Sequence, residues 1–139
     1  MQVKDMMHQG AEYVAPNAKL QVIAKKMRDH DVGAIPVCEG GKTIGMVTDR
    51  DIAIRALANG KDIATLEAKD VMSKHVVFCR DTEKAEDAIR IMEENRIRRL
   101  PVLNEAKKLV GMVSLGDISH ALSRDRTGEV TRAVSAHHR

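Results

Sequence analysis

Aromatic residues are almost missing from this sequence of 139 residues, which has one tyrosine, Tyr13, one phenylalanine, Phe78, and no tryptophan. Proteins that hold single-stranded nucleic acid stack its bases on aromatic side chains. The formal charge of +3, from 23 basic and 20 acidic residues, is also mild. We therefore do not expect a nucleic-acid-binding protein. The core must be aliphatic and rich in methionine, of which the chain has 8.

Cysteines and long apolar runs are scarce as well. The two cysteines, Cys38 and Cys79, lack the spacing of a metal site, and each lies at the end of an apolar run, as small buried residues often do. The N-terminus is not typical of a signal peptide, and no apolar run approaches the roughly 20 residues of a membrane span. We expect a soluble, cytoplasmic protein without a membrane partner, in a reducing compartment.

What the chain does have is an internal repeat. Residues 45–52, Gly-Met-Val-Thr-Asp-Arg-Asp-Ile, return at residues 111–118 as Gly-Met-Val-Ser-Leu-Gly-Asp-Ile. A shift of 65 residues aligns the flanking segments too, so that residues 3–57 match residues 68–123 with one extra residue in the second copy. Two copies are too few for a solenoid, and the sequence predicts a pseudo-symmetric pair.

Each copy has the periodicity of β-α-β-β-α. Apolar residues at i, i+3, i+4 and i+7 predict a helix near Leu20 and another near Ala85, with Asn17 and Thr82 as N-caps. The proline in the second strand of each copy is expected at a strand start or an unpaired edge. The expected elements are helical turns at 3–7 and 68–72, strands at 12–14, 34–38, 43–47, 76–79, 99–103 and 109–113, and closing helices at 49–58 and 115–124.

The sequence thus predicts an α/β (α+β) protein made of two similar halves. The boundaries that we expect are repeat 1 at 1–60, a linker at 61–67, repeat 2 at 68–124 and a polar tail at 125–139. A unit of about 65 residues buries too little surface to be comfortably stable alone. We therefore expect the two repeats to pack on each other.

The pattern resembles the cystathionine-β-synthase (CBS) domain family. The resemblance rests on the β-α-β-β-α repeat, on the proline-containing segments 32–37 and 97–102, and on the repeated Gly-apolar-apolar-Thr/Ser-x-x-Asp-Ile motif. It covers about residues 1–124. Two such domains in tandem resemble a Bateman module, and the compact arrangement is similar to small stand-alone bacterial two-CBS proteins. The resemblance implies that the two repeats pack sheet to sheet.

The resemblance also implies a regulatory function. Family members commonly bind AMP, ADP or ATP, and sometimes S-adenosylmethionine, in two clefts between the repeats, and modules usually pair as dimers. We therefore expect a homodimer that responds to an adenine nucleotide by a change of conformation or of dimer contacts. No cofactor is required, and a regulated protein target would be a separate chain, because no effector domain is present.

The repeated motif allows two interpretations of its hydroxyl and acid. Thr48-x-x-Asp51 and Ser114-x-x-Asp117 have the spacing of a helix capping box, with aspartate in place of glutamate. A helix N-terminus also suits a phosphate, and an aspartate there can accept two hydrogen bonds from a ribose diol. Both roles are compatible, because a carboxylate has lone pairs for more than one partner.

The resemblance assigns a different set of residues to each cleft. We predict that the first cleft binds phosphate better, because guanidinium groups suit phosphate and the second has Gly33-Ala34 where the first has arginines. A solvated basic edge is the structural alternative for these arginines. The first set is Ser114, Asp117, Arg98, Arg99, Glu12, Val32 and Gly33, and the second is Thr48, Asp51, Arg50, Val77 and Ile97.

Catalytic and metal-binding motifs are missing from the sequence. It has no nucleophile elbow, phosphate-binding loop or His-Glu-x-x-His helix, so we expect no enzyme. Its six histidines are dispersed, and no metal site is expected. Two alternatives stay open beside the nucleotide sensor. One is a structural or interaction protein with vestigial clefts, and the other is a metal- or redox-responsive stress protein that uses Cys38, Cys79 and histidines.

Overall fold

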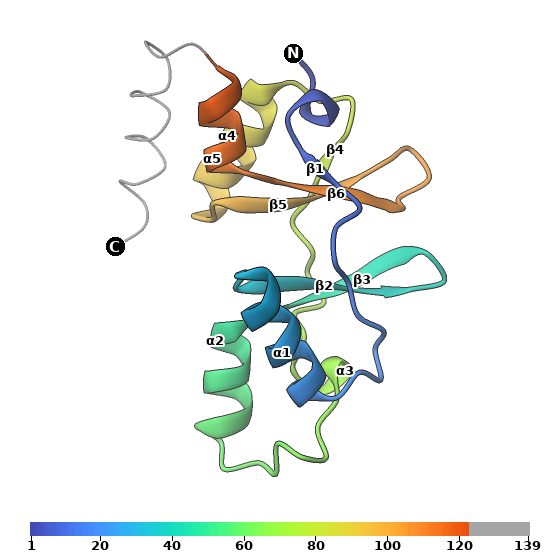
Figure 1. Cartoon of the computed structure of the whole chain (residues 1–139), viewed down its shortest axis with the longest axis vertical. Helices are drawn as coiled ribbons and strands as arrows, with labels where there is room; N and C mark the ends of the chain where they lie inside the picture. Colours follow the sequence, from blue (N-terminus) through green and yellow to red (C-terminus); the bar gives the residue numbers. More distant parts are fainter. Residues whose placement is uncertain (123–139) are drawn as a thin grey trace. The chain divides into compact units, whose positions relative to one another are not determined.

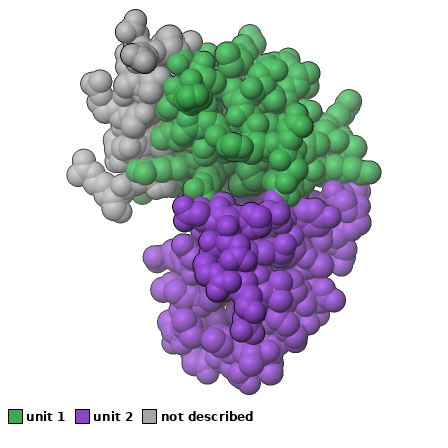
Figure 2. All heavy atoms as spheres, in the orientation of Figure 1, with its two compact units in different colours: residues 1–11, 77–139 green, residues 12–76 purple. Residues whose placement is uncertain are grey.

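The structure, a computed structural model, describes residues 1–122, so the predicted tail at 125–139 and the end of the last predicted helix lie outside the described residues. The chain forms two compact units (Figure 2). Unit 2 is residues 12–76, and unit 1 joins residues 1–11 to the chain from residue 77 onward. The first eleven residues therefore pack with the second copy of the repeat, and residues 61–76 pack with the first.

Unit 2 is built on a β-hairpin flanked by helices (Figure 1). Strand β2 (Ala34–Glu39) pairs antiparallel with β3 (Lys42–Thr48) through a turn at Gly40 and Gly41, both of positive φ. Helix α1 (Leu20–His30) precedes the hairpin; α2 (Asp49–Asp51), the π-helix η2 (Ile52–Leu57) and α3 (Ala68–Val71) follow it. The predicted apolar stripe of α1 is confirmed at Leu20, Ile23 and Met27, which are buried in the core of unit 2.

Unit 1 repeats this plan with a wider sheet. Its strands β1 (His8–Gln9), β4 (Cys79–Arg80), β5 (Arg99–Leu103) and β6 (Leu109–Ser114) lie in the order β1-β6-β5-β4. Helices α4 (Ala85–Asn95) and α5 (Leu115–Ala121) pack on the sheet, and the 3-10 turn η1 (Val3–Asp5) precedes β1. The core is aliphatic, as predicted, with fully buried Met92, Leu100, Val113 and Ile118.

The repeated glycine of the motif lies, in each unit, against the segment that leads into the other copy of the repeat, residues 1–11 in unit 1 and residues 61–76 in unit 2. A Cβ on Gly111 would lie 2.5 Å from the backbone oxygen of His8, which β1 places against β6. A Cβ on Gly45 would lie 2.9 Å from the backbone oxygen of Ser73, whose segment bridges to Met46. Only glycine leaves room for a backbone this close, so the motif's glycine is explained by packing.

The first predicted strand of each copy is shorter than expected. Residues 12–14 contribute one bridge, from Val14 to Val37, and only Cys79 of residues 76–79 lies in a strand, β4. The position expected for the prolines is wrong, since Pro36 and Pro101 lie inside β2 and β5. Each proline is tolerated because the strand or bridge beside it pairs with the next residue. Val14 pairs with Val37, and Cys79 pairs with Val102, so neither pairing needs an N–H from the proline.

Both predicted N-caps are also wrong. The helices begin after Lys19 and Lys84, whose backbones are still extended. Each lysine bridges to a segment distant in sequence, Lys19 to Glu67 and Lys84 to Gln2. These bridges keep the chain extended beyond Asn17 and Thr82, and at α4 the carboxylate of Asp87 also accepts from the N–H of Lys84 at 3.0 Å.

Candidate functional site

The candidate site of unit 1 lies where the β5–β6 pair ends and α5 begins. Arg99 is paired with Ser114 across the two strands, and the N–H of Leu115 donates to the carbonyl oxygen of Arg98 at 2.8 Å. Asp117 follows in the first turn of α5. The structure therefore brings together the four residues of unit 1 that the sequence assigned to the first cleft.

Asp117 is fixed by the predicted capping box. Its N–H donates to Ser114 Oγ at 3.1 Å, and the N–H of Ser114 donates to Asp117 Oδ2 at 2.8 Å. The same pair of bonds joins Asp51 to Thr48 in unit 2, at 3.0 and 2.9 Å. The capping interpretation is confirmed in both copies, and in each it uses one carboxylate oxygen and leaves the other for a further partner.

The partner of the second oxygen differs between the units. Asp117 Oδ1 lies 3.0 Å from His8 Nε2, whereas Asp51 Oδ1 lies 3.7 Å from Nε of Arg55, in the π-helix η2 that continues α2. Neither partner was predicted from the sequence. Arg55 is readable from its i, i+4 spacing to Asp51, but His8 has no local signal, because pairing of β1 with β6 brings it to the site.

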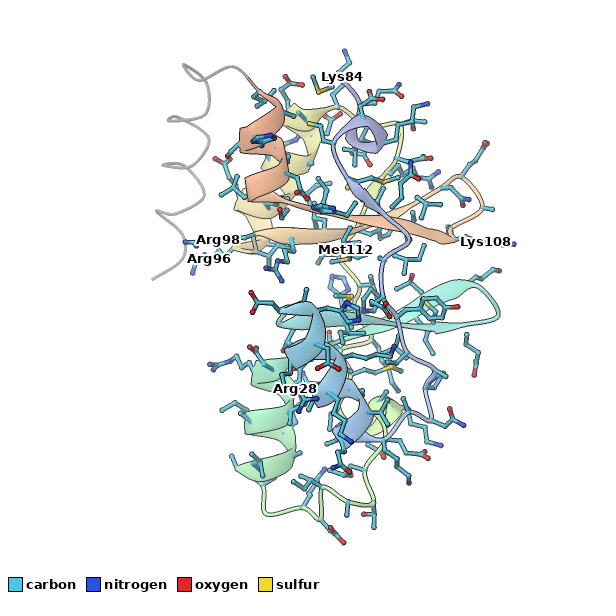
Figure 3. All side chains as sticks on the ribbon, viewed as in Figure 1. Arg28, Lys84, Arg96, Arg98, Lys108 and Met112 are labelled. Atoms are coloured by element: carbon cyan, nitrogen blue, oxygen red, sulfur yellow. The ribbon has the colours of Figure 1, made fainter. Side chains whose placement is uncertain are left out.

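Arginines give the unit 1 site a positive rim. Arg98 and Arg99 are exposed, and neither makes an ion pair with another residue among 1–122. Arg96 and Arg98 both project from the segment between α4 and β5 (Figure 3). Exposed guanidinium groups without a carboxylate partner are free to bind an anion such as phosphate.

The corresponding position in unit 2 is acidic. Gly33 aligns with Arg98, and a Cβ on Gly33 would lie 3.0 Å from Asp49 Oδ2. The N–H of Asp49 donates to the carbonyl oxygen of Gly33 at 2.9 Å, and Asp49 Oδ1 accepts from the N–H of Arg50. Where unit 2 has this carboxylate, unit 1 has the buried Leu115. The unit 2 site therefore differs from the unit 1 site in two ways: it lacks the two arginines, and it has an additional carboxylate.

The remaining predicted site residues are divided between the units. Glu12 lies in unit 2, where its carboxylate pairs with Lys26 at 3.1 Å and His30 at 3.4 Å. The hydrogen bond from Lys26, followed by its charge, lowers the pKa of Glu12. Val32 packs against the core of unit 2, and Val77 and Ile97 pack against that of unit 1. That these residues, with Gly33, border the adenine base of a nucleotide stays a prediction from the family resemblance.

Both cysteines are free and buried, with Cys38 in unit 2 and Cys79 in unit 1. Burial, reinforced by the charges of Glu83 and Asp81, raises the pKa of Cys79 to about 12. Burial also raises the pKa of Cys38, partly offset by a contact with Thr43. Since the thiolate is the reactive form, neither residue has the environment of a redox-sensing cysteine.

The cysteines provide a test of that conclusion. Iodoacetamide at pH 8 is expected to alkylate Cys79 in the folded protein at least about a hundredfold more slowly than in guanidinium chloride, because folding suppresses its thiolate. The rate in the folded protein should rise with pH toward 12, past the usual range of a thiol. Mass spectrometry of each cysteine peptide reads both rates. Rapid labelling of folded Cys79 at pH 8 would revive the redox alternative.

Neither a metal-binding cluster nor a membrane-spanning helix occurs in the described part of the chain. Residues 1–122 contain no group of three or more histidine, cysteine or acidic side chains placed to hold a metal ion. None of the helices described is both long and apolar enough to cross a membrane.

Comparison with known proteins supports the resemblance. The chain is 41% identical over 134 residues to the CBS domain-containing protein YhcV of Bacillus subtilis, covering 96% of this chain and 94% of that one. It is 33% identical over 132 residues to hypoxic response protein 1 of Mycobacterium tuberculosis, covering 94% and 92%. A crystal structure of hypoxic response protein I with two coordinated zinc ions matches with a TM-score of 0.82 and 35% identity, over 88% of this chain and all of that one.

Two further solved structures contain ligands. CBSX2 in complex with AMP matches with a TM-score of 0.73 and 25% identity, over 86% of this chain and 94% of that one. The CBS domain pair of MJ0100, in complex with 5′-methylthioadenosine and S-adenosyl-L-methionine, matches with a TM-score of 0.77 and 26% identity, over 88% and 100%. The CBS domain family itself matches residues 3–57 and 68–124. The chain therefore belongs to the CBS domain family and carries two CBS domains in tandem.

Proposed function

We propose that this protein is a regulatory, non-enzymatic module that binds an adenine nucleotide through Ser114, Asp117, Arg98 and Arg99. The observation that carries the proposal is that a carboxylate of fixed orientation and two arginines without an ion pair among residues 1–122 belong to the same end of the β5–β6 pair. The capping box holds Asp117 in one orientation, and Arg98 is bonded through its backbone to the residue that follows Ser114. The AMP complex of CBSX2 and the S-adenosylmethionine complex of MJ0100 support the same class of ligand.

Each group has a defined task in this proposal. The outward oxygen of Asp117 accepts hydrogen bonds from the two hydroxyls of a ribose, and hydrogen bonds to a charged group are stronger than neutral ones. Arg98 and Arg99 bind the phosphate with paired N–H donors. Neither task requires a metal or a bond to be broken, which fits a sensor rather than an enzyme.

The Thr48/Asp51 site is the weaker phosphate site in this proposal. Asp49 lies beside Gly33 there and repels a phosphate, whereas the unit 1 site offers cations. Arg50 is the cation of this site, since it is exposed and has no ion pair among residues 1–122. We expect this site to favour a nucleoside or a ligand with fewer charges.

The biological setting is part of the proposal. We propose a cytoplasmic homodimer whose nucleotide-dependent change is transmitted to a separate protein target. A ligand shifts such an equilibrium only if it binds one state better than the other. The structural alternative, with vestigial clefts, has one observation in its favour, namely that both oxygens of Asp117 already have partners.

A ligand screen by thermal unfolding tests the proposal. AMP, ADP, ATP, NAD, S-adenosylmethionine and Zn²⁺ would each be added to the full chain. A ligand at 100 times its Kd adds about 2.7 kcal/mol to the free energy of unfolding, so an adenine nucleotide should raise the Tm by several degrees. No shift with any nucleotide at millimolar concentration would favour the structural alternative, and a shift with Zn²⁺ alone would favour a metal-binding protein.

A further inference from the structure

Among residues 1–122, Asp117 forms an ion pair with one residue, His8, which lies outside the predicted site. Its Nε2 lies 3.0 Å from Asp117 Oδ1, on the solvent side of the carboxylate, with 82% of the His8 side chain exposed against 16% of Asp117. The other oxygen, Oδ2, is bonded to the N–H of Ser114. Each oxygen of the Asp117 carboxylate therefore already has one partner, and the partner of Oδ1 is an imidazole.

We propose that His8 is an internal competitor of the ribose, so that the N-terminal segment of the chain regulates the unit 1 site. The inference rests on the proposed function. A ribose diol reaches Asp117 Oδ1 only after the imidazole leaves it. The histidine thereby lowers the affinity for ligands that have a 2′,3′-diol and leaves the affinity for ligands without one unchanged.

The backbone of the segment stays in place while the imidazole moves. The N–H of Val3 donates to the carbonyl oxygen of Glu83 at 2.7 Å, and that of Lys4 to Asp81 at 3.0 Å. His8 itself pairs with Met112 through β1 and β6. These bonds use main-chain atoms only, and among residues 1–122 the His8 side chain has no hydrogen bond or ion pair besides the one with Asp117. A change of side-chain rotamer is enough to release Asp117.

The competitor is specific to unit 1. In unit 2 the residue opposite Met46 is Ser73, which corresponds to His8 opposite Met112. Ser73 makes no side-chain contact with Asp51, whose second oxygen is approached by Arg55 from its own helix. Anything that binds residues 1–10 would therefore change ligand affinity at unit 1 alone, and the ligand would change that binding by the same factor.

The strength of the competition follows from the exposure of the pair. The imidazole is 82% exposed, and an ion pair with a solvent-exposed partner contributes little, so removing the imidazole should tighten ligand binding by about two- to fivefold. The effect is small enough for the site to open at ordinary ligand concentrations. It is also large enough to measure by calorimetry.

The test compares AMP with 2′,3′-dideoxy-AMP, which lacks the diol. Three full-length proteins would be prepared, all with Asp51→Ala to remove binding at the unit 2 site. The first has no other change, the second adds His8→Ala, and the third adds Gln9→Ala. Gln9 is the matched control because it is the exposed neighbour of His8 on the same strand and has no side-chain contact with Asp117. Thermal unfolding without ligand checks that all three fold.

The expected result is that His8→Ala lowers the Kd for AMP by about two- to fivefold and leaves that for 2′,3′-dideoxy-AMP unchanged, while Gln9→Ala alters neither. An unchanged or higher Kd for AMP in His8→Ala, or an equal gain for both ligands, would overturn the inference alone. If the native protein binds AMP and every Asp51→Ala chain does not, unit 1 is no binding site and the inference is also overturned. If no chain, native included, binds any nucleotide, the proposed function itself is wrong.

Discussion

The Gly111→Ala substitution is expected to lower the free energy of unfolding by about 1–3 kcal/mol. The new Cβ would lie 2.5 Å from the backbone oxygen of His8 and 2.8 Å from Met7 Sδ. The methionine can move, but the backbone of His8 cannot retreat without loss of its pairing with β6. Urea unfolding followed by circular dichroism measures the change.

A matched substitution lies five residues further along the chain. A Cβ on Gly116, in helix α5, would meet only Ser114 Oγ at 3.6 Å, an ordinary contact. Gly116→Ala should therefore leave stability unchanged or raise it by up to about 1 kcal/mol. Gly45→Ala should resemble Gly111→Ala, because its Cβ would lie 2.9 Å from the backbone oxygen of Ser73. Equal stability of the Gly111→Ala and Gly116→Ala proteins would contradict this account of the motif.

The Asp117→Ala substitution is expected to weaken AMP binding at least about tenfold, because it removes hydrogen bonds from a ribose to a charged acceptor. Asp51→Ala should cost less, since Asp49 makes that site unfavourable for a phosphate. Calorimetric titration with AMP and with adenosine separates the two contributions. Loss of Asp117 should weaken AMP and adenosine alike, because both carry the ribose, whereas loss of Arg98 or Arg99 should reduce the preference for AMP over adenosine.

A control is needed because Asp117 also caps α5. Asp117→Ala removes the acceptor of the Ser114 N–H, and loss of such a cap costs about 1 kcal/mol. The Arg98→Gln and Arg99→Gln substitutions remove charge without touching the cap and should reduce AMP affinity but not adenosine affinity. Arg90→Gln, on an exposed face of α4 where Arg90 pairs with Asp87, is the matched control. Equal losses of AMP affinity in Asp117→Ala and Asp51→Ala would contradict the asymmetry of the sites.

Local patterns predicted the elements that local interactions determine. The apolar stripes of α1 and α4 are buried except at Ala24, which is exposed, and Ile89, which is partly buried, and Met27 and Met92 lie at corresponding places in the two cores. The capping boxes of Thr48 and Ser114 formed because both partners lie within one helical turn. The strands of both hairpins lie within a residue of their predicted positions, since alternation and the intervening loops define them.

Features that depend on distant segments could not be read from the sequence. Residues 1–11 pack with the second copy of the repeat and not with the first, and this brings His8 to Asp117, 109 positions further along the chain. The N-caps of α1 and α4 also depend on distant segments, because Lys19 bridges to Glu67 and Lys84 bridges to Gln2. Asp49 has the sequence position of an ordinary residue in the first turn of a helix, and only its place beside Gly33 in the fold makes the unit 2 site acidic.

Calorimetric titration of AMP into the native protein and into the Asp51→Ala/Asp117→Ala double variant tests the central proposal most directly. The proposal predicts saturable binding to the native chain and binding at least about tenfold weaker to the folded double variant, because both ribose acceptors are gone. Circular dichroism of the double variant verifies that it is folded. Binding of the same affinity to both proteins, or to neither, would contradict the proposal that these aspartates hold an adenine nucleotide.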